Sequence, residues 1–416
     1  MLILAVLRPL GYGMTVWLSA AAGWGAAVLL WPKITGKQRI QALAILAVGI
    51  LFALAGFTRG APVSLQQAFG QNQMILAMLA AVSFLKLTNR PTREGDAIPT
   101  GPGAFIRTLA GVHLFGAAIN ITALVIIADR LAAQAPFRHL QALSLSRGFC
   151  LSVMYSPFIA GMALALALSP GARLDIVALA GIPYAAVGLM LTAWHLSLAH
   201  GDEVAVFKGY PIHLESLWFP ALLAVLVAIV HGMYPRLSIL LLISFLAPVM
   251  VVIIVIHGDG RSAGVTRLTR HVETILPQMS GELLLFLSAG ILAAGLTSLA
   301  SSMGNPVPFD EFDWLAGSLT LTTIVALSII GIHPIICVSF FAPLIIPLDP
   351  QPDLVALVFV MGWAIGCTVS PFSGTNLTMQ GRYGISSWSI TLGNLGYCAL
   401  MVVVGWGFIY GFTRFV

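Results

Sequence analysis

Long apolar runs, separated by short polar links, occupy almost the whole chain. A membrane-spanning helix needs roughly 20 apolar residues, and most of the runs have about that length. No segment of ~10 residues alternates strictly between apolar and polar positions, so the pattern favours helices over an outer-membrane barrel. The sequence therefore predicts an all-α polytopic membrane protein. Its apolar runs cover residues 10–31, 40–57, 73–88, 105–133, 147–168, 174–197, 216–232, 237–257, 281–298, 314–348, 354–380 and 388–413.

Two runs carry a polar interruption in the middle and predict re-entrant hairpins. The run 105–133 contains Asn120 near its centre, and the run 314–348 is interrupted by Gly-Ile-His-Pro at 331–334. Proline removes a helix hydrogen bond and disfavours helix at the residue before it. We therefore expect each hairpin to join two half-length helices at a polar tip near the middle of the membrane.

Two other runs contain a break without turning back. The first break, 155–161, includes Ser-Pro-Phe at 156–158, and the second, 369–376, includes Ser-Pro-Phe at 370–372. Both predict unwound backbone inside a spanning helix.

The two Ser-Pro-Phe sequences also indicate an internal repeat. Residues 156 and 370 lie 214 positions apart, and at this offset Gly148 falls on Gly362 and Asn120 on Pro334. Three identical residues recur easily by chance, but the matching tips and runs favour a duplication. Five spans plus one hairpin form each repeat. The first repeat covers 1–200 (scaffold spans 10–88, hairpin 105–133, broken helix 147–168, span 174–197), the linker 201–215, and the second repeat 216–416 (scaffold spans 216–298, hairpin 314–348, broken helix 354–380, span 388–413).

Charge supports an inverted arrangement of the repeats. The chain has 20 Lys and Arg against 15 Asp and Glu, a net charge of +5. With the N-terminus outside, fifteen basic residues, Arg147 among them, fall in inside loops and five outside, as the positive-inside rule requires. Five is an odd number of spans, so the second repeat is inverted relative to the first. The net charge thus indicates topology and no nucleic-acid partner.

Composition excludes a soluble enzyme, since 59% of the residues are hydrophobic and only 8% are charged. The sequence contains no HExxH, GxSxG or P-loop lysine motif, which indicates that the protein is not an enzyme. The four cysteines lie in apolar runs without a CxxC pair, so we expect no disulfide framework, no metal site and no cofactor.

The breaks and tips carry the candidate binding site. A broken helix leaves unpaired N–H and C=O groups that lipid cannot satisfy, and secondary transporters use such groups to bind solutes. The alternatives are a proline kink satisfied by neighbouring hydroxyls, helix–helix hydrogen bonding at the first tip, and a capping role for the histidine at the second. The candidates are Asn120, Thr122, Ser156, Pro157, Gly161, His333, Ser370, Pro371, Ser373, Gly374, Thr375 and Asn376.

Fixed charge is missing from the predicted membrane core. Glu282 and Asp175 fall at span ends, which argues against a carboxylate-based Na⁺/H⁺ antiporter. No buried Lys or Arg is evident either. We therefore expect an anion to be held by backbone N–H groups, hydroxyls and amides.

The order of a hairpin and then a broken helix, occurring twice, resembles the ion transporter superfamily. The run 282–292 before the second hairpin and Pro-Phe-Ser-Gly-Thr-Asn at 371–376 contribute to this resemblance. That group includes divalent anion:sodium symporters and the large membrane subunits of tripartite dicarboxylate transporters. The resemblance implies an elevator-type carrier, in which the hairpins and broken helices form a moving transport domain and the other spans a dimeric scaffold.

The residues at the two hairpin tips indicate which coupling ions are candidates. Sodium-coupled members often carry Ser-Asn-Thr at each tip, whereas this chain keeps Asn120 and a displaced Thr122 at the first and has His333 at the second. Na⁺ and H⁺ are therefore both candidates. We expect an ion-coupled secondary transporter of a small organic anion in the inner membrane, and the resemblance implies a homodimer. The alternatives are an inorganic ion exporter or antiporter of the same fold, or a membrane scaffold without transport.

Overall fold

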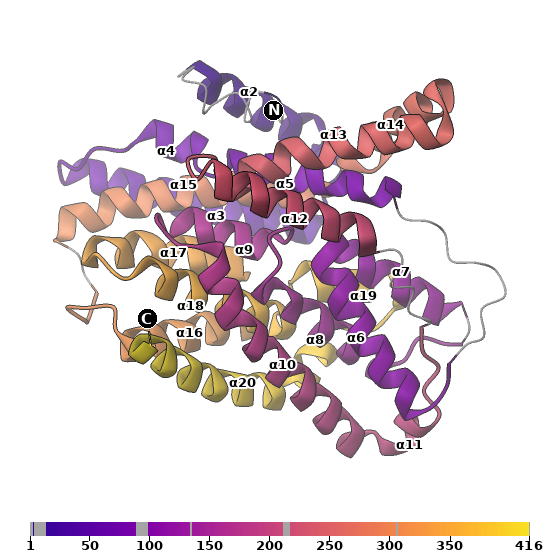
Figure 1. Cartoon of the computed structure of the whole chain (residues 1–416). Coiled ribbons are helices and arrows are strands. Elements are labelled where there is room, and N and C mark those ends of the chain that lie inside the picture. The colour runs from indigo at the N-terminus through magenta and orange to yellow at the C-terminus, as the bar shows by residue number, and fades with distance from the viewer. Residues whose placement is uncertain are drawn as a thin grey trace. The chain divides into compact units, whose positions relative to one another are not determined.

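The computed structural model describes residues 3, 14–88, 99–133, 135–210, 217–304 and 307–415 (Figure 1). In these residues all regular structure is helical, apart from one isolated bridge between Thr100 and Lys208. Eight of the helices in this part of the chain are long and apolar enough to cross a membrane, and four more apolar helices are shorter. The prediction of an all-α polytopic membrane protein is therefore confirmed, while the number of ten spans and the inverted repeat stay predictions.

The chain forms two compact units that do not follow the two halves of the sequence. Unit 1 comprises 1–89, 219–308 and 339–347, and unit 2 comprises 90–218, 309–338 and 348–416. Each unit thus draws on both halves of the chain. Both hairpin tips and both predicted breaks fall in unit 2.

Unit 1 is built around two helices that pack side by side along their length, with glycines at the contact. A Cβ atom built on Gly295 would lie 2.1 Å from the carbonyl oxygen of Gly49, so the two backbones touch where those helices meet. Nearby, the Asn72 amide donates to the carbonyl of Phe286 at 2.8 Å. The unit contains α2 (Met14–Leu29), α3 (Gly36–Thr58), α4 (Leu65–Gly70), α5 (Gln73–Ser83), α12 (Trp218–Met233), α13 (Ile239–Asp259), α14 (Arg261–Thr274) and α15 (Ser280–Met303).

Helix α14 was missed by the search for apolar runs, because its sequence is mostly polar. Its side chains form hydrogen bonds to the rest of unit 1. Arg267 donates to Asp259 and to the carbonyl of Leu87, each at 2.7 Å, and buried His271 lies 2.9 Å from the hydroxyl of Ser83.

Unit 2 holds the helices that bear the candidate site. Helix α17 crosses the boundary, since its residues from 339 onward belong to unit 1. Residues 211–216 of the predicted linker lie outside the described residues, as do residues 10–13 of the first apolar run. The helices are α6 (Pro102–Ile119), α7 (Ile121–Ala132), α8 (His139–Leu151), η4 (Ser152–Met154), α9 (Ala160–Leu168), α10 (Leu174–Ala199), α11 (Gly201–Ala205), α16 (Trp314–Ile329), α17 (Pro334–Ile345), α18 (Pro352–Val369), α19 (Gly374–Tyr383) and α20 (Ser387–Phe415).

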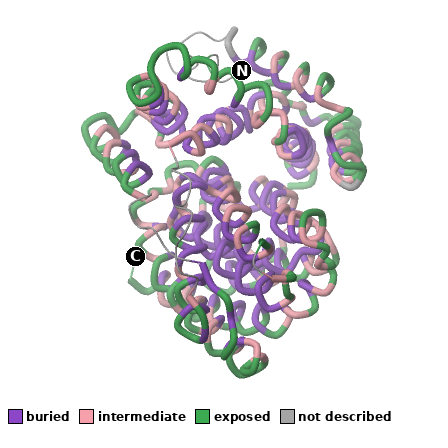
Figure 2. Tube along the Cα trace, turned by 90° about the vertical axis from the view of Figure 1, so that its right-hand side faces the viewer, coloured by how far each residue is buried: buried purple, intermediate pink, exposed green. Residues whose placement is uncertain are grey.

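Helix α18 is the centre of unit 2. Every residue from Asp353 to Val369 is buried, as expected for a helix that is apolar all round and enclosed by other helices. Helices α8, α9, α10, α16 and α20 all pack against it. In Figure 2 the inner helices are buried along their length, whereas outer helices alternate between buried and exposed residues. The end of α18, where the second break begins, therefore lies among several neighbouring helices.

Candidate functional site

The second break separates α18 from α19, and the side chain of Asn376 stabilises its unwound backbone. The Asn376 amide nitrogen donates to the carbonyls of Thr368 and Ser370, at 3.1 and 2.9 Å. The Ser373 hydroxyl accepts from the backbone N–H of Asn376 and so caps α19. Pro371 has no N–H to continue the helix. The unwound segment is therefore stabilised by its own side chains.

The first break lies between η4 and α9. The Ser156 hydroxyl donates to the carbonyl of Ala117 in the first hairpin and accepts from the N–H of Phe158. Pro157 follows in the non-helical turn, and α9 begins at Ala160 without a side-chain cap. Because no side chain caps this helix, the N–H groups of the first turn of α9 are available to another partner.

The first hairpin tip turns at Asn120, between α6 and α7. Asn120 has a φ of 57° and a ψ of −151°, a backbone conformation that is strained for residues other than glycine. Its side-chain oxygen accepts from the N–H of Ile121 at 2.7 Å. Thr122, in the first turn of α7, is partly exposed, and its hydroxyl makes no hydrogen bond within the described part of the chain.

The second hairpin tip turns at Gly331, between α16 and α17. Gly331 has a φ of 100°, and a Cβ atom there would lie 2.6 Å from the ring of Phe372 in the second break. The Nδ1 atom of His333 accepts from the N–H of Ile335 at 3.1 Å, so this histidine caps α17. This hydrogen bond is the one expected from the capping interpretation of His333.

The two breaks and the two tips meet around α18 and α19. Trp363 of α18 touches Gly161 in the first turn of α9 and lies edge-on to the ring of His333, with ring centroids 5.7 Å apart. A Cβ atom on Gly374, the first residue of α19, would lie 3.9 Å from the side chain of Ile121. Helices α7, α9, α17 and α19 therefore all begin in one region of unit 2.

Four helix N-termini in one region favour an anion. Each N-terminus carries about half a positive charge, and the N–H groups of its first turn point along the helix axis. In α17 these groups are already used, because Pro334 has no N–H and those of Ile335 and Ile336 bond to His333. Around this region the structure leaves Gly374 and Thr122 partly exposed, whereas Thr375 and Asn376 are buried. The Thr375 hydroxyl lies 3.9 Å from the sulfur of Cys150. The groups available to a solute are thus mainly backbone N–H groups and the tip side chains.

Replacing His333 separates its two interpretations. His333→Asn keeps an acceptor two residues before Ile335, so we expect a melting temperature close to that of the wild type. His333→Ala loses the cap and is expected to cost about 1 kcal/mol of stability. If His333 carries the coupling proton, the pH dependence of uptake disappears in both variants. A pH dependence that persists in His333→Asn would leave only the capping role.

The expectation of no buried basic residue is wrong for Arg147. We expected this residue in an inside loop, but it lies within α8 and is fully buried. Its guanidinium donates to Asn394 Oδ1 at 2.7 Å, to the carbonyl of Gly393 at 2.9 Å and to His195 Nδ1 at 3.1 Å. Its Cζ atom lies 4.3 Å from the centre of the Tyr397 ring. Polar acceptors on α10 and α20 thus replace water around this charge.

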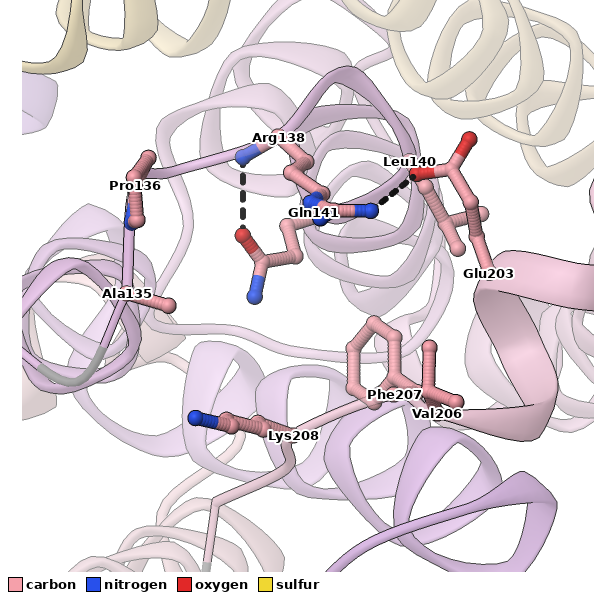
Figure 3. Close-up of a pocket in the computed structure, with 9 residues that line it drawn as sticks. All are labelled: Ala135, Pro136, Arg138, Leu140, Gln141, Glu203, Val206, Phe207 and Lys208. Atoms are coloured by element: carbon pink, nitrogen blue, oxygen red, sulfur yellow. Dashed lines mark hydrogen bonds and ion pairs between the residues drawn. The ribbon is translucent and has the colours of Figure 1, made fainter.

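One pocket, of about 230 Å³, lies at the opposite end of α8 from the first break (Figure 3). Arg138 and Lys208 line it, and Glu203 lies 3.6 Å from the Arg138 guanidinium. A helix of thirteen residues is about 20 Å long, so this pocket is separate from the breaks. None of the predicted site residues lines it. Among the described residues, no group of three His, Cys, Asp or Glu side chains is placed to hold a metal ion.

Comparisons with known proteins support the fold. No protein-family model matches the sequence, and no curated protein matches it. The structure is similar to the crystal structure of the YdaH transporter of Alcanivorax borkumensis, which was described as having an unusual topology. The TM-score is 0.53 at 13% identity, over 89% of this chain and 97% of that chain. The chain therefore has the fold of a membrane transporter, while membership of the ion transporter superfamily stays a prediction.

Proposed function

We propose that this protein is a secondary active transporter that carries a small organic anion across the inner membrane. The observation that carries the proposal is the meeting of four helix N-termini inside unit 2, two at the breaks and two at the hairpin tips. These N-termini supply positive potential and hydrogen-bond donors at a depth where lipid supplies neither. A protein that only served as a membrane scaffold would have no use for such groups, and an inorganic ion carrier is the alternative that the test below addresses.

The division into units supports an elevator-type mechanism driven by an ion gradient. Unit 2 contains both breaks and both tips, so the proposal assigns the moving transport domain to it and the scaffold to unit 1. The bound anion would travel with unit 2 and face each side of the membrane in turn. Na⁺ and H⁺ are the candidate coupling ions.

Ligand-induced stabilisation identifies the anion. The melting temperature of the purified protein is measured with mono-, di- and tricarboxylates. Phosphate and sulfate are measured in the same way to represent inorganic anions. A ligand present at a hundred times its Kd stabilises the folded state by about 2.7 kcal/mol. Compounds that raise the melting temperature are then tested for uptake into proteoliposomes with and without an ion gradient. Uptake of inorganic anions alone would select the alternative, and the absence of any uptake would reject transport.

Thr122→Val tests the tip as part of the anion site. Valine has the shape of threonine but lacks the hydroxyl, and a hydrogen bond to a charged ligand contributes about 1.5–3 kcal/mol. We therefore expect uptake of the identified anion at low concentration to fall about 10- to 100-fold, with an unchanged melting temperature. The matched control is Thr323→Val, on an exposed face of α16, where the hydroxyl bonds only to the carbonyl of Leu319. Equal uptake by both variants would remove Thr122 from the site.

A further inference from the structure

The charge of Arg147 has no counterion in the described part of the chain. Its partners are an amide oxygen, a backbone carbonyl, an imidazole nitrogen and an aromatic ring, and none of the ion pairs there includes it. Because arginine only donates, Nδ1 of His195 must accept, and this imidazole is neutral. An arginine stays protonated in proteins, and burying a lone charge costs several kcal/mol. Some nearby group must therefore offset that cost.

Hydrogen bonds connect Arg147 and its neighbour Ser146 to the end of α18. Asn394, which accepts from Arg147, donates to the carbonyl of Thr368 at 2.9 Å. The Ser146 hydroxyl donates at 3.0 Å to the side-chain oxygen of Asn376, whose nitrogen bonds the carbonyls of Thr368 and Ser370. Both routes begin on α8 and end on the carbonyls where the second break starts.

The end of α18 carries charge of the sign that offsets this cost, and Asn394 connects it to Arg147 by hydrogen bonds. A helix C-terminus carries about half a negative charge and unpaired carbonyls, which favour a cation. In broken transporter helices such carbonyls can coordinate Na⁺. Here amide hydrogens of Asn376 and Asn394 bind the carbonyl of Thr368, and Arg147 places a full positive charge behind Asn394.

We propose that Arg147 is the fixed counter-charge of the second break and takes the place of a bound Na⁺ there. The inference rests on the proposed function in one respect. If the protein is a transporter, the charge of Arg147 allows an anion to bind at this break without a co-bound Na⁺. Arg147 acts through Asn394 and is therefore a positioning residue. The sequence could not indicate this role, because the partners of Arg147 come from helices far apart in the chain.

Three variants test the proposal with Na⁺ itself as the probe. The melting temperature of the purified protein is measured in NaCl and in choline chloride of equal concentration. Arg147→Gln removes the charge. Asn394→Asp neutralises it with an isosteric carboxylate and removes one of the two amide donors to the Thr368 carbonyl, leaving that of Asn376. NaCl is expected to raise the melting temperature of both variants by about 2–4 °C more than that of the wild type. Arg147→Lys keeps the charge and is expected to behave as the wild type does.

Each outcome decides the question. A variant that is recovered folded only in NaCl supports the proposal, since Na⁺ has then replaced the lost charge. The proposal is overturned if both neutralised variants respond to NaCl as the wild type does, or if both are lost equally in the two salts. The measurement involves no transport, so it stands apart from the uptake tests. A Na⁺ response without any anion uptake would reject the proposed function and leave the role of Arg147 in place.

Discussion

Asn376→Asp is expected to abolish uptake and to lower the stability of the protein by roughly 2–5 kcal/mol. The Asn376 side-chain nitrogen has two hydrogens, and each binds a carbonyl at the end of α18, those of Thr368 and Ser370. An ionised aspartate donates no hydrogen bond, and a protonated one donates a single hydrogen bond. At least one of the two carbonyls therefore loses one of its two donors, with Asn394 still donating to Thr368 and the N–H of Ser373 to Ser370. The carboxylate also repels the carbonyls that it faces. The unwound segment should lose its shape, which uptake into proteoliposomes and thermal unfolding will measure.

Gln380→Glu is the matched control for this change. It makes the same amide-to-acid replacement one turn further along α19. The Gln380 amide oxygen accepts from the N–H of Ser387 at 3.2 Å, and glutamate keeps that acceptor. Uptake and melting temperature should stay close to those of the wild type. If Asn376→Asp transported as well as Gln380→Glu, the arrangement of the second break would not matter for transport.

The positions of the breaks and tips could be predicted because they depend on local chemistry. Proline at 157 and 371 cannot donate the hydrogen bond that continues a helix, whatever surrounds it. The structure has non-helical backbone at both positions, between η4 and α9 and between α18 and α19. Gly331 and Asn120 are residue types that tolerate positive φ, and both adopt it at the hairpin tips. Proline alone does not specify a break, however, because Pro183, Pro248 and Pro343 lie inside α10, α13 and α17.

The partners of the polar residues could not be predicted, because they depend on tertiary contacts. Asn376 was a candidate for binding a solute, yet in the structure its amide bonds to protein groups on both sides. Arg147 follows polar residues near the start of an apolar run, so its charge suggested a loop. Its burial depends on Asn394 and His195, which lie on α20 and α10. Sequence spacing carries no information about such distant pairs.

Gly181→Val is expected to disrupt the first break. A Cβ atom on Gly181 would lie 2.1 Å from the carbonyl oxygen of Met154, the last residue of η4. The obstacle is backbone, so α10 must move away from η4 or the turn at Tyr155 must shift. Overpacking of this kind costs about 1–3 kcal/mol or more, and a displaced break should reduce uptake at least about tenfold. Gly181→Ala already introduces the clash and should show the same effects to a smaller degree.

The control for Gly181 is Gly396→Ala in α20, where an added Cβ atom meets nothing within 4 Å. Alanine favours helix over glycine by about 1 kcal/mol, so this variant should be as stable as the wild type or slightly more so. The graded series therefore predicts normal uptake for Gly396→Ala, reduced uptake for Gly181→Ala and the lowest uptake for Gly181→Val. The same order should appear in the melting temperatures. Wild-type uptake by Gly181→Val would show that close packing of α10 against η4 is not required for the function of the first break.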